Sequence, residues 1–162
     1  MSSRPHIIRL RGPWLYEPLL RLPLDGSKIA DNGALPASGK THAPFDWAQV
    51  VGLDFRGRVR YTRHFGRPTG LVTTDLVQLV VARIDTLGAI FLNGEMLHQI
   101  PPGQIDTRVD ITQQLQRRNV LNIEVEATEM EFDCLEPPLR DPQRQTCGLT
   151  GEVRLEIFSG DP

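Results

Sequence analysis

Five carboxylate side chains lie close together in one segment of this sequence and are the first candidates for chemistry. They follow an apolar, alternating stretch, and they are Glu129, Glu131, Asp133, Glu136 and Asp141. Hydrolysis of a glycosidic bond needs two carboxyl groups held about 5 Å or about 6.5–9.5 Å apart across the sugar. Nothing in the sequence marks one of these five groups as buried. We therefore expect a solvated acidic loop and not a catalytic pair.

Residue spacing supports no other catalytic or metal site. His6, His42, His64 and His98 are far apart in the sequence and show no ligand spacing. Oxygen ligands for a structural calcium ion exist in the acidic segment, but no calcium-binding pattern appears there. The sequence contains neither Gly-x-Ser-x-Gly nor a glycine-rich phosphate loop, and no cysteine adjoins a histidine. We expect no metal, no cofactor and no enzymatic activity in this chain.

Length, charge and composition narrow the class of protein. The 162 residues amount to about one domain, and the hydrophobic fraction of 40% is ordinary for a globular protein. A net charge of −2 gives no whole-chain attraction to nucleic acid or to an anionic membrane. No apolar run reaches the ~18–20 residues of a membrane span, and the first residues lack the apolar core of a secretory signal. We expect a cytoplasmic protein in which Cys134 and Cys147 are reduced thiols, although a disulfide across the loop between them is conceivable.

An alternating hydrophobic pattern predicts the strands that would position any site. We expect strands at Ile7–Leu10, Trp14–Leu19, Val59–Phe65, Asp75–Ile84, Arg108–Ile111, Asn119–Ala127 and Gly151–Phe158. Residues 1–56 form the irregular part, with a loop or covering segment from Pro23 to Pro44. Residues 57–158 form the core of the fold. Short strands at close spacing with almost no helix predict an all-β sandwich or barrel, as a single domain over residues 1–162.

The strongest local signal is a β-hairpin around Asn93-Gly94. This dipeptide supplies the two positive φ angles of a type I′ turn, and apolar residues flank it directly. A regular register then pairs Leu92 with Glu95, Phe91 with Met96, and Ile90 with Leu97.

In this register Phe91, Met96 and His98 face away from Ile90 and Leu92. An outward pair of phenylalanine and methionine indicates either a sheet face covered by another segment or a contact patch. The first third of the chain must pack somewhere, which favours the covered face. Phe91, Met96 and His98 are therefore candidate binding residues. The two tryptophans, Trp14 and Trp47, are expected to fill the ends of the sandwich.

Four segments carry a resemblance to a known family. Tyr61-Thr62-Arg63-His64-Phe65 fits Tyr-x-Arg-x-Phe, and Ile84-Asp85 precedes the hairpin at a similar distance. Val109-Asp110-Ile111-Thr112 leads into a Leu…Asn-x-Leu-x-Val segment, and Gly148–Leu155 fits Gly-Ile-x-Gly-x-Val-x-Leu. In this order they resemble the N-terminal domain of family 2 glycoside hydrolases, the group of β-galactosidases and β-glucuronidases. The resemblance covers about residues 57–157.

The resemblance implies a jelly-roll β-sandwich of the galactose-binding-like type. In that family the catalytic carboxylates belong to a separate barrel domain, which these 162 residues do not contain. The chain departs from the family pattern at Thr150, where an aromatic is common, and at Cys147, where a second glycine is common. The loop at residues 128–147 leans toward the sugar site in the related family. That placement makes Asp141 and Gln145 the remaining candidate binding residues, although the motif around Asp141 differs.

Three functions follow from these observations. The resemblance implies a non-catalytic carbohydrate-binding module with a carbohydrate as its ligand. A structural or protein-interaction domain that has lost sugar binding is the first alternative, with a contact through the Phe91–Met96 face or the 128–147 loop. A small enzyme associated with glycoside hydrolysis is the second alternative, and the acidic segment alone favours it.

Overall fold

The computed structural model describes residues 4–22, 34–44, 47–52, 55–127, 149 and 151–160. Ten strands and one short helix occupy these ranges. The elements are β1 (His6–Arg9), β2 (Trp14–Arg21), β3 (Gly39–Thr41), α1 (Trp47–Val51), β4 (Gly57–Gly66), β5 (Leu76–Arg83), β6 (Leu87–Leu92), β7 (Glu95–Ile100), β8 (Ile105–Asp110), β9 (Arg118–Ala127) and β10 (Val153–Phe158). The described part of the chain has no helix with the length and apolar character of a membrane span.

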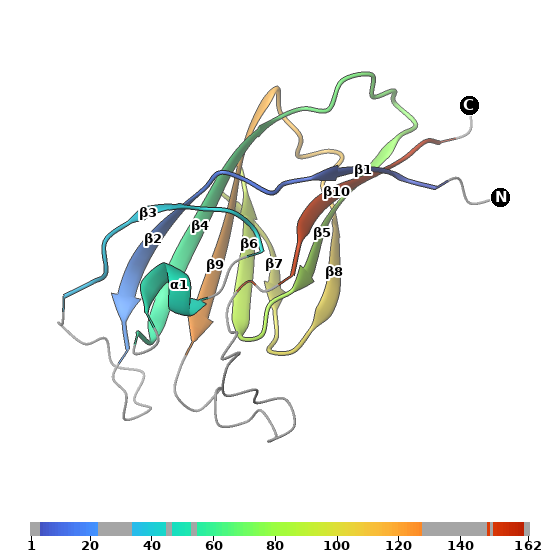
Figure 1. Ribbon diagram of the computed structural model, residues 1–162. Helices are drawn as coiled ribbons and strands as arrows, with labels where there is room; N and C mark the ends of the chain where they lie inside the picture. The colour runs from blue at the N-terminus through green and yellow to red at the C-terminus, as the bar shows by residue number, and fades with distance from the viewer. Residues whose placement is uncertain are drawn as a thin grey trace.

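Two antiparallel sheets pack face to face to form the sandwich (Figure 1). The larger sheet has the strand order β3-β2-β4-β9-β6-β7, and the smaller has the order β1-β10-β5-β8. Most neighbours in these sheets are far apart in sequence, as in the pairing of β4 with β9 and of β1 with β10. The structure therefore confirms the predicted all-β sandwich.

The predicted strands agree with the structure to within a few residues, with one addition. The stretch from Pro23 to Pro44 was expected to be a loop or a cover. Its described part includes β3, which pairs with the start of β2. Only three residues pair, and they add a short edge strand to the larger sheet. Such a short pairing has too few residues for its alternation to be read in a sequence.

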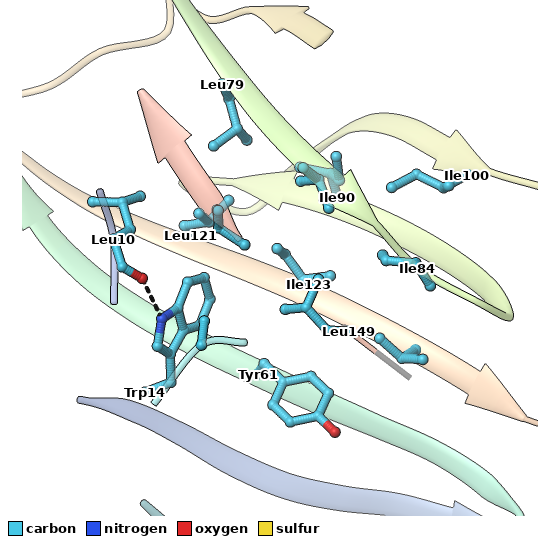
Figure 2. Packing of buried hydrophobic residues seen from close by; sticks show 14 of the residues in the cluster. Leu10, Trp14, Tyr61, Leu79, Ile84, Ile90, Ile100, Leu121, Ile123 and Leu149 are labelled. Atoms are coloured by element: carbon cyan, nitrogen blue, oxygen red, sulfur yellow. Dashed lines mark hydrogen bonds between the residues drawn. The ribbon is translucent and has the colours of Figure 1, made fainter. Parts of the chain in front are cut away.

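The core lies between the two sheets, where alternate residues of facing strands interdigitate (Figure 2). Leu79, Leu121 and Ile123 are fully buried, which agrees with the predicted inward faces of β5 and β9. Both tryptophans are also buried, and each indole finds a backbone acceptor. Trp14 Nε1 donates to the carbonyl of Leu10 at 2.7 Å, and Trp47 Nε1 donates to a backbone carbonyl at 2.8 Å. The predicted structural role of the tryptophans is confirmed, because a buried indole N–H needs a partner.

The hairpin between β6 and β7 corrects the predicted register. Asn93 and Gly94 have the expected positive φ angles of 53° and 86°, and Leu92 and Phe91 pair as predicted. Beyond them a bulge shifts the register, so that Ile90 lies opposite His98 and not opposite Leu97. The pairing of Ile90 with Leu97 was therefore wrong.

Burial of Ile100 explains the bulge. In a regular hairpin Ile100 would point outward, whereas the bulge turns it inward, where it is fully buried opposite Gly88. Gly88 leaves space for Ile84, because a Cβ at this position would lie 2.8 Å from Ile84 Cδ1. Burying one such side chain stabilises a fold by about 1.5–3 kcal/mol. This gain exceeds the free-energy cost of the strand-pairing hydrogen bonds that the bulge disrupts.

The outer face of the smaller sheet is held by a charge network. Val80 points outward yet is fully buried, because the register places it between Arg108 and Arg154. Both arginines donate hydrogen bonds to Glu156, with Arg154 Nε at 2.8 Å from Oε1. Burial raises the pKa of Glu156, but the hydrogen bonds from Arg108 and Arg154 outweigh it, and the pKa is lowered overall.

Candidate functional site

The outer face of the larger sheet is where the structure gathers chemically useful side chains. Alternation along β4, β9 and β6 projects one residue in two away from the core, and these residues are partly exposed. On β4 the projecting residues are charged or polar, and so are those of β9 apart from Val120, whereas on β6 they are apolar. The face therefore changes from polar to apolar from its centre toward β7.

Arginine–glutamate pairs cross the centre of this face. Arg58 donates to Oε2 of Glu126 from Nε at 3.0 Å and from Nη2 at 2.7 Å. Arg60 donates to Oε1 of Glu124 in the same way, at 3.2 and 2.9 Å. Each arginine lies directly opposite its glutamate in the pairing of β4 with β9. No described residue donates a hydrogen bond to the second carboxylate oxygen of either glutamate.

A shallow hollow of about 260 Å³ lies between these pairs and the apolar strands β6 and β7. We call it the first hollow. Its lining consists of Arg58, Leu87, Gly88, Ala89, Phe91, Met96, Gln99, Glu124 and Glu126. Leu87 and Met96 are 40% and 53% exposed, so the described residues do not cover them.

A second hollow, of about 400 Å³, opens on the same face at the opposite edge of the sheet. It is lined by Leu15, Tyr16, Glu17, Ser38, Gly39, Lys40 and Thr62. The phenol of Tyr16 lies over Gly39, where a Cβ would come within 2.6 Å of its hydroxyl. This second hollow contains one hydroxyl-bearing ring but no exposed cluster of apolar side chains, in contrast to the first.

The structure brings together only some of the predicted binding residues. Phe91 and Met96 pair across the hairpin on the outer face, as the sequence predicted, and both line the first hollow. The favoured cover by the first third of the chain is not seen among the described residues, because Met96 is exposed. His98 does not join them, because the bulge turns it toward the side of Ile90 and puts Gln99 in its place. His98 Nε2 is buried and has no hydrogen-bond partner among the described residues. Asp141 and Gln145 lie outside the described residues.

The other predicted features of the acidic segment are not among the described residues either. Its five carboxylates, and Cys134 and Cys147, also lie outside the described ranges. Within those ranges no group of three or more His, Cys, Asp or Glu side chains could hold a metal ion. The predicted redox state of the cysteines stays a prediction.

Sequence reasoning missed the polar side of the first hollow. Alternation placed Glu124 and Glu126 outward, but it did not show that Arg58 lies opposite Glu126. That contact depends on the pairing of β4 with β9, which joins residues 68 positions apart. Gln99 was missed because the regular hairpin register assigned its place to His98. Charged residues at alternate positions of β4 and of β9 were the signal in the sequence that could have indicated these arginine–glutamate pairs.

The first hollow is suited to binding by contact and hydrogen bonding. Phe91 offers a ring face, Arg58 and the amide of Gln99 offer N–H donors, and the glutamates offer acceptors. Each glutamate is held by an arginine on one of its oxygens, which fixes the position of the other. Mixed apolar and polar linings of this kind are typical of sites for small polar ligands.

The fold of this chain is similar to the folds of known proteins. No model of a protein family and no curated protein matches this sequence. Among solved structures, the β-glucuronidase of Bifidobacterium dentium complexed with coumarin-3-O-glucuronide is similar at a TM-score of 0.71 and 17% identity. The match covers 99% of this chain and 31% of that one.

Two further structures extend the comparison to another enzyme. A β-glucuronidase from an uncultured Clostridium species has a TM-score of 0.69 and 20% identity, over 98% of this chain and 30% of that one. A rhamnosidase from Novosphingobium sp. PP1Y has a TM-score of 0.64 and 20% identity, over 97% of this chain and 16% of that one. The chain thus spans less than a third of each matched enzyme, and it has the fold of one β-sandwich domain of these glycoside hydrolases, as the resemblance implied.

Proposed function

We propose that this chain is a non-catalytic carbohydrate-binding domain whose ligand lies in the first hollow. The observation that carries the proposal is the position of Phe91 beside paired hydrogen-bonding groups on an open sheet face. A sugar has apolar C–H faces and a rim of hydroxyl groups, so a site for it needs an aromatic ring next to donors and acceptors. The fold supports the proposal, because the matched enzymes act on glycosides.

The hydrogen-bonding groups of the hollow match the needs of a hydroxyl-rich ligand. Arg58 occupies Oε2 of Glu126, which leaves Oε1 without a donor from the described residues. Arg60 occupies Oε1 of Glu124 in the same manner. The two glutamates project from positions 124 and 126 on the same side of β9, and their backbones are about 7 Å apart along the strand. Two hydroxyl groups of one sugar unit can donate to such a pair.

The proposal places no catalysis in this chain. A glycosidase positions one carboxyl group to give a proton and a second to attack or to activate water. In the first hollow both glutamates lie on one side of the ligand and are tied to arginines. The matched enzymes are three to six times as long as the aligned region, which leaves ample chain for a catalytic domain.

Titration of the isotope-labelled protein with a panel of monosaccharides and oligosaccharides, followed by amide NMR shifts, tests the proposal. We expect shifts concentrated at residues 87–99 and 122–126, with millimolar affinity or better. Phe91→Ala should weaken binding about two- to tenfold, since an aromatic contact contributes about 0.5–1.5 kcal/mol. Leu15→Ala is the matched control, because Leu15 is exposed on the same face but lines the second hollow. A panel that produces no shifts at these residues would contradict the proposal.

A protein-docking domain is the second candidate, and the exposed apolar side chains favour it. Leu87, Phe91 and Met96 form a continuous apolar strip at the edge of the sheet, and large apolar patches often mark contact sites. Sedimentation of the protein over a range of concentrations tests whether a second copy covers this strip. Association that Met96→Lys abolishes would support docking, whereas a monomer with sugar-induced shifts at Phe91 would favour the carbohydrate-binding domain.

A further inference from the structure

One end of the sandwich collects arginines from three separate segments of the chain. It is the end where β4 leaves the larger sheet and β9 enters it, at the top of Figure 1. The residues are Arg11, Arg63, Arg67, Arg117 and Arg118, and we call this group the basic end.

Backbone contacts hold these segments together. The N–H of Arg67 donates to the carbonyl of Arg117 at 3.0 Å, and Arg118 pairs with Gly66 at the last position of the ladder. Arg63 Nη1 donates to the carbonyl of Pro13 at 3.0 Å, which ties the segment that contains Arg11 to β4. The five side chains therefore start from neighbouring backbone.

The arginines of the basic end lack the carboxylate partners that most other arginines of the described residues have. Six other arginines lie within 4.0 Å of a carboxylate, and they are Arg9, Arg58, Arg60, Arg83, Arg108 and Arg154. Among the described residues, no carboxylate lies within that distance of any of the five arginines of the basic end. Arg11, Arg67, Arg117 and Arg118 are exposed. Five cations without a carboxylate partner among the described residues thus lie at one end of a chain whose net charge is −2.

Two of the guanidinium groups are already positioned. Arg63 and Arg67 each donate one N–H to a backbone carbonyl, of Pro13 at 3.0 Å and of Leu115 at 3.5 Å. A guanidinium group has five N–H donors in a planar fork, so most remain available to a ligand. The fork matches the oxygens of a carboxylate or a sulfate group, which it can bind through two parallel hydrogen bonds. Anchored arginines also lose less conformational freedom when they bind.

We propose that the basic end is a binding site for an acidic polysaccharide, one that carries uronate carboxylates or sulfate groups at regular intervals. Its charges form two groups. One group consists of Arg11 and Arg63, and the other consists of Arg67, Arg117 and Arg118. Charges distributed in this way favour a chain with repeated anionic groups over a single small anion. The site is separate from the first hollow, whose lining contains none of these arginines.

Nucleic acid is a poorer match to the same charges. Proteins that bind single strands stack the bases on exposed aromatic rings, and those that bind duplexes use a broadly basic surface. Phe65 lies between Arg63 and Arg67 in the sequence, but its ring is packed against the core. The net charge of −2 gives no long-range attraction to a duplex. The basic end is therefore suited to short-range recognition of discrete anionic groups.

Binding of fluorescent oligosaccharides from heparin and from polygalacturonate tests this proposal, with neutral dextran oligosaccharides as a blank. We expect binding of at least one acidic oligosaccharide at about 25 mM NaCl and a loss of at least about tenfold in affinity at about 200 mM, because counterions are released on binding. The sulfated and uronate arms distinguish which anionic group the site prefers. Amide NMR shifts of the wild-type protein should appear at residues 63–67 and 117–118.

Two double variants with equal loss of charge provide the decisive comparison. Arg117→Gln with Arg118→Gln should weaken binding at least about tenfold, since each lost contact to an anionic group removes a charge-assisted hydrogen bond. Arg4→Gln with Arg9→Gln removes the same charge elsewhere and should change the affinity less than about twofold. Equal weakening by both variants would overturn the proposal, as would the absence of binding to either acidic oligosaccharide. Duplex DNA that binds as tightly as the oligosaccharides, with the same loss in the first variant, would overturn the assignment to polysaccharide.

Discussion

Asn93 is the residue that links the hairpin to the rest of the larger sheet. Its backbone adopts φ 53°, and its side chain amide donates to Asn119 Oδ1 and to the carbonyl of Gln114, both at 3.1 Å. Its Oδ1 accepts the N–H of Val120 at 2.9 Å. Asn119, which is buried, uses its own amide in turn to close the loop before β9. Asn93 therefore forms the turn with Gly94 and also joins the hairpin to the segment that leads into β9.

Replacement of Asn93 by alanine should lower the free energy of unfolding by about 2–4 kcal/mol, because it leaves buried donors and acceptors unpaired and strains a positive φ. Urea denaturation measures the change. Asn122→Ala is the control, since Asn122 is half-buried and makes one side-chain contact, with Thr62, on the outer face. A loss that is no larger for Asn93→Ala than for Asn122→Ala would show that only the turn conformation matters.

Glu156 should make the stability of the fold sensitive to acid. Hydrogen bonds from Arg108 and Arg154 lower its pKa in the folded state, despite the opposing effect of burial. A lowered folded-state pKa stabilises the protein above the pKa of the unfolded chain, near pH 4.5, and that contribution is lost as the pH falls further. Glu156→Gln should therefore flatten the decline of stability below about pH 4.5 and lower stability at pH 7 by about 1–3 kcal/mol. Thermal melts from pH 3 to 7 measure both effects, with Glu95→Gln, an exposed site, as the control.

At the scale of elements, the segment that leads into β10 depends on close approach of two backbones. Gly151 donates its N–H to the carbonyl of Arg83 at 3.1 Å, and a Cβ at this position would lie 2.3 Å from the backbone nitrogen of Arg83. Neither backbone can move without breaking the pairing of β5 with β10. This contact explains the glycine in the Gly-x-Val-x-Leu pattern that the sequence shares with family 2 glycoside hydrolases.

Gly151→Ala should consequently lower the free energy of unfolding by about 1–3 kcal/mol, which is the range for overpacking against a rigid neighbour. Gly66→Ala is the matched control, because the nearest heavy atom to a Cβ there is 3.9 Å away. Chemical denaturation of the two variants gives the comparison. Equal stability of both variants would mean that β10 can shift to accept a methyl group.

The strands could be predicted from the sequence because alternation and turn residues are local signals. The burial of the two tryptophans and the inward faces of β5 and β9 follow from such signals, and so does the outward pairing of Phe91 with Met96. Strand pairing could not be predicted, because nothing local says that β4 lies beside β9. The polar side of the first hollow depends on that pairing.

The bulge in β7 is a second feature that could not be predicted from the sequence. It goes with the burial of Ile100 opposite Gly88, a tertiary contact with no local signature. That one contact moved His98 off the outer face and put Gln99 there. The basic end was also missed, because its five arginines come from three segments whose proximity only the fold reveals.

At the scale of the whole molecule, both sheets contribute to one core among the described residues. The single domain over residues 1–162 stays a prediction. The buried cluster contains residues from β2, β4, β6 and β9 of the larger sheet and from β5 and β10 of the smaller sheet. Neither sheet can keep its inner face covered without the other.

We therefore expect one cooperative unfolding transition. Tryptophan fluorescence reports on Trp14 and Trp47, which lie in the larger sheet and in α1, whereas circular dichroism reports on all strands. Coincident midpoints and slopes in urea by the two probes would confirm a single unit. Two resolved transitions, or a midpoint that differs between probes, would show that part of the chain unfolds independently.

The pairing of β1 with β10 has a consequence for how the molecule responds to a pulling force. His6 lies opposite Ile157 in an antiparallel pair at the edge of the smaller sheet, and both ends of the described chain leave from the same side (Figure 1). A force that separates the two ends loads the hydrogen bonds of this pair one after another, as in a zipper, because they run perpendicular to the strands. The fold should therefore open from β1 at low force and resist little, in contrast to sandwiches whose terminal strands must slide past each other.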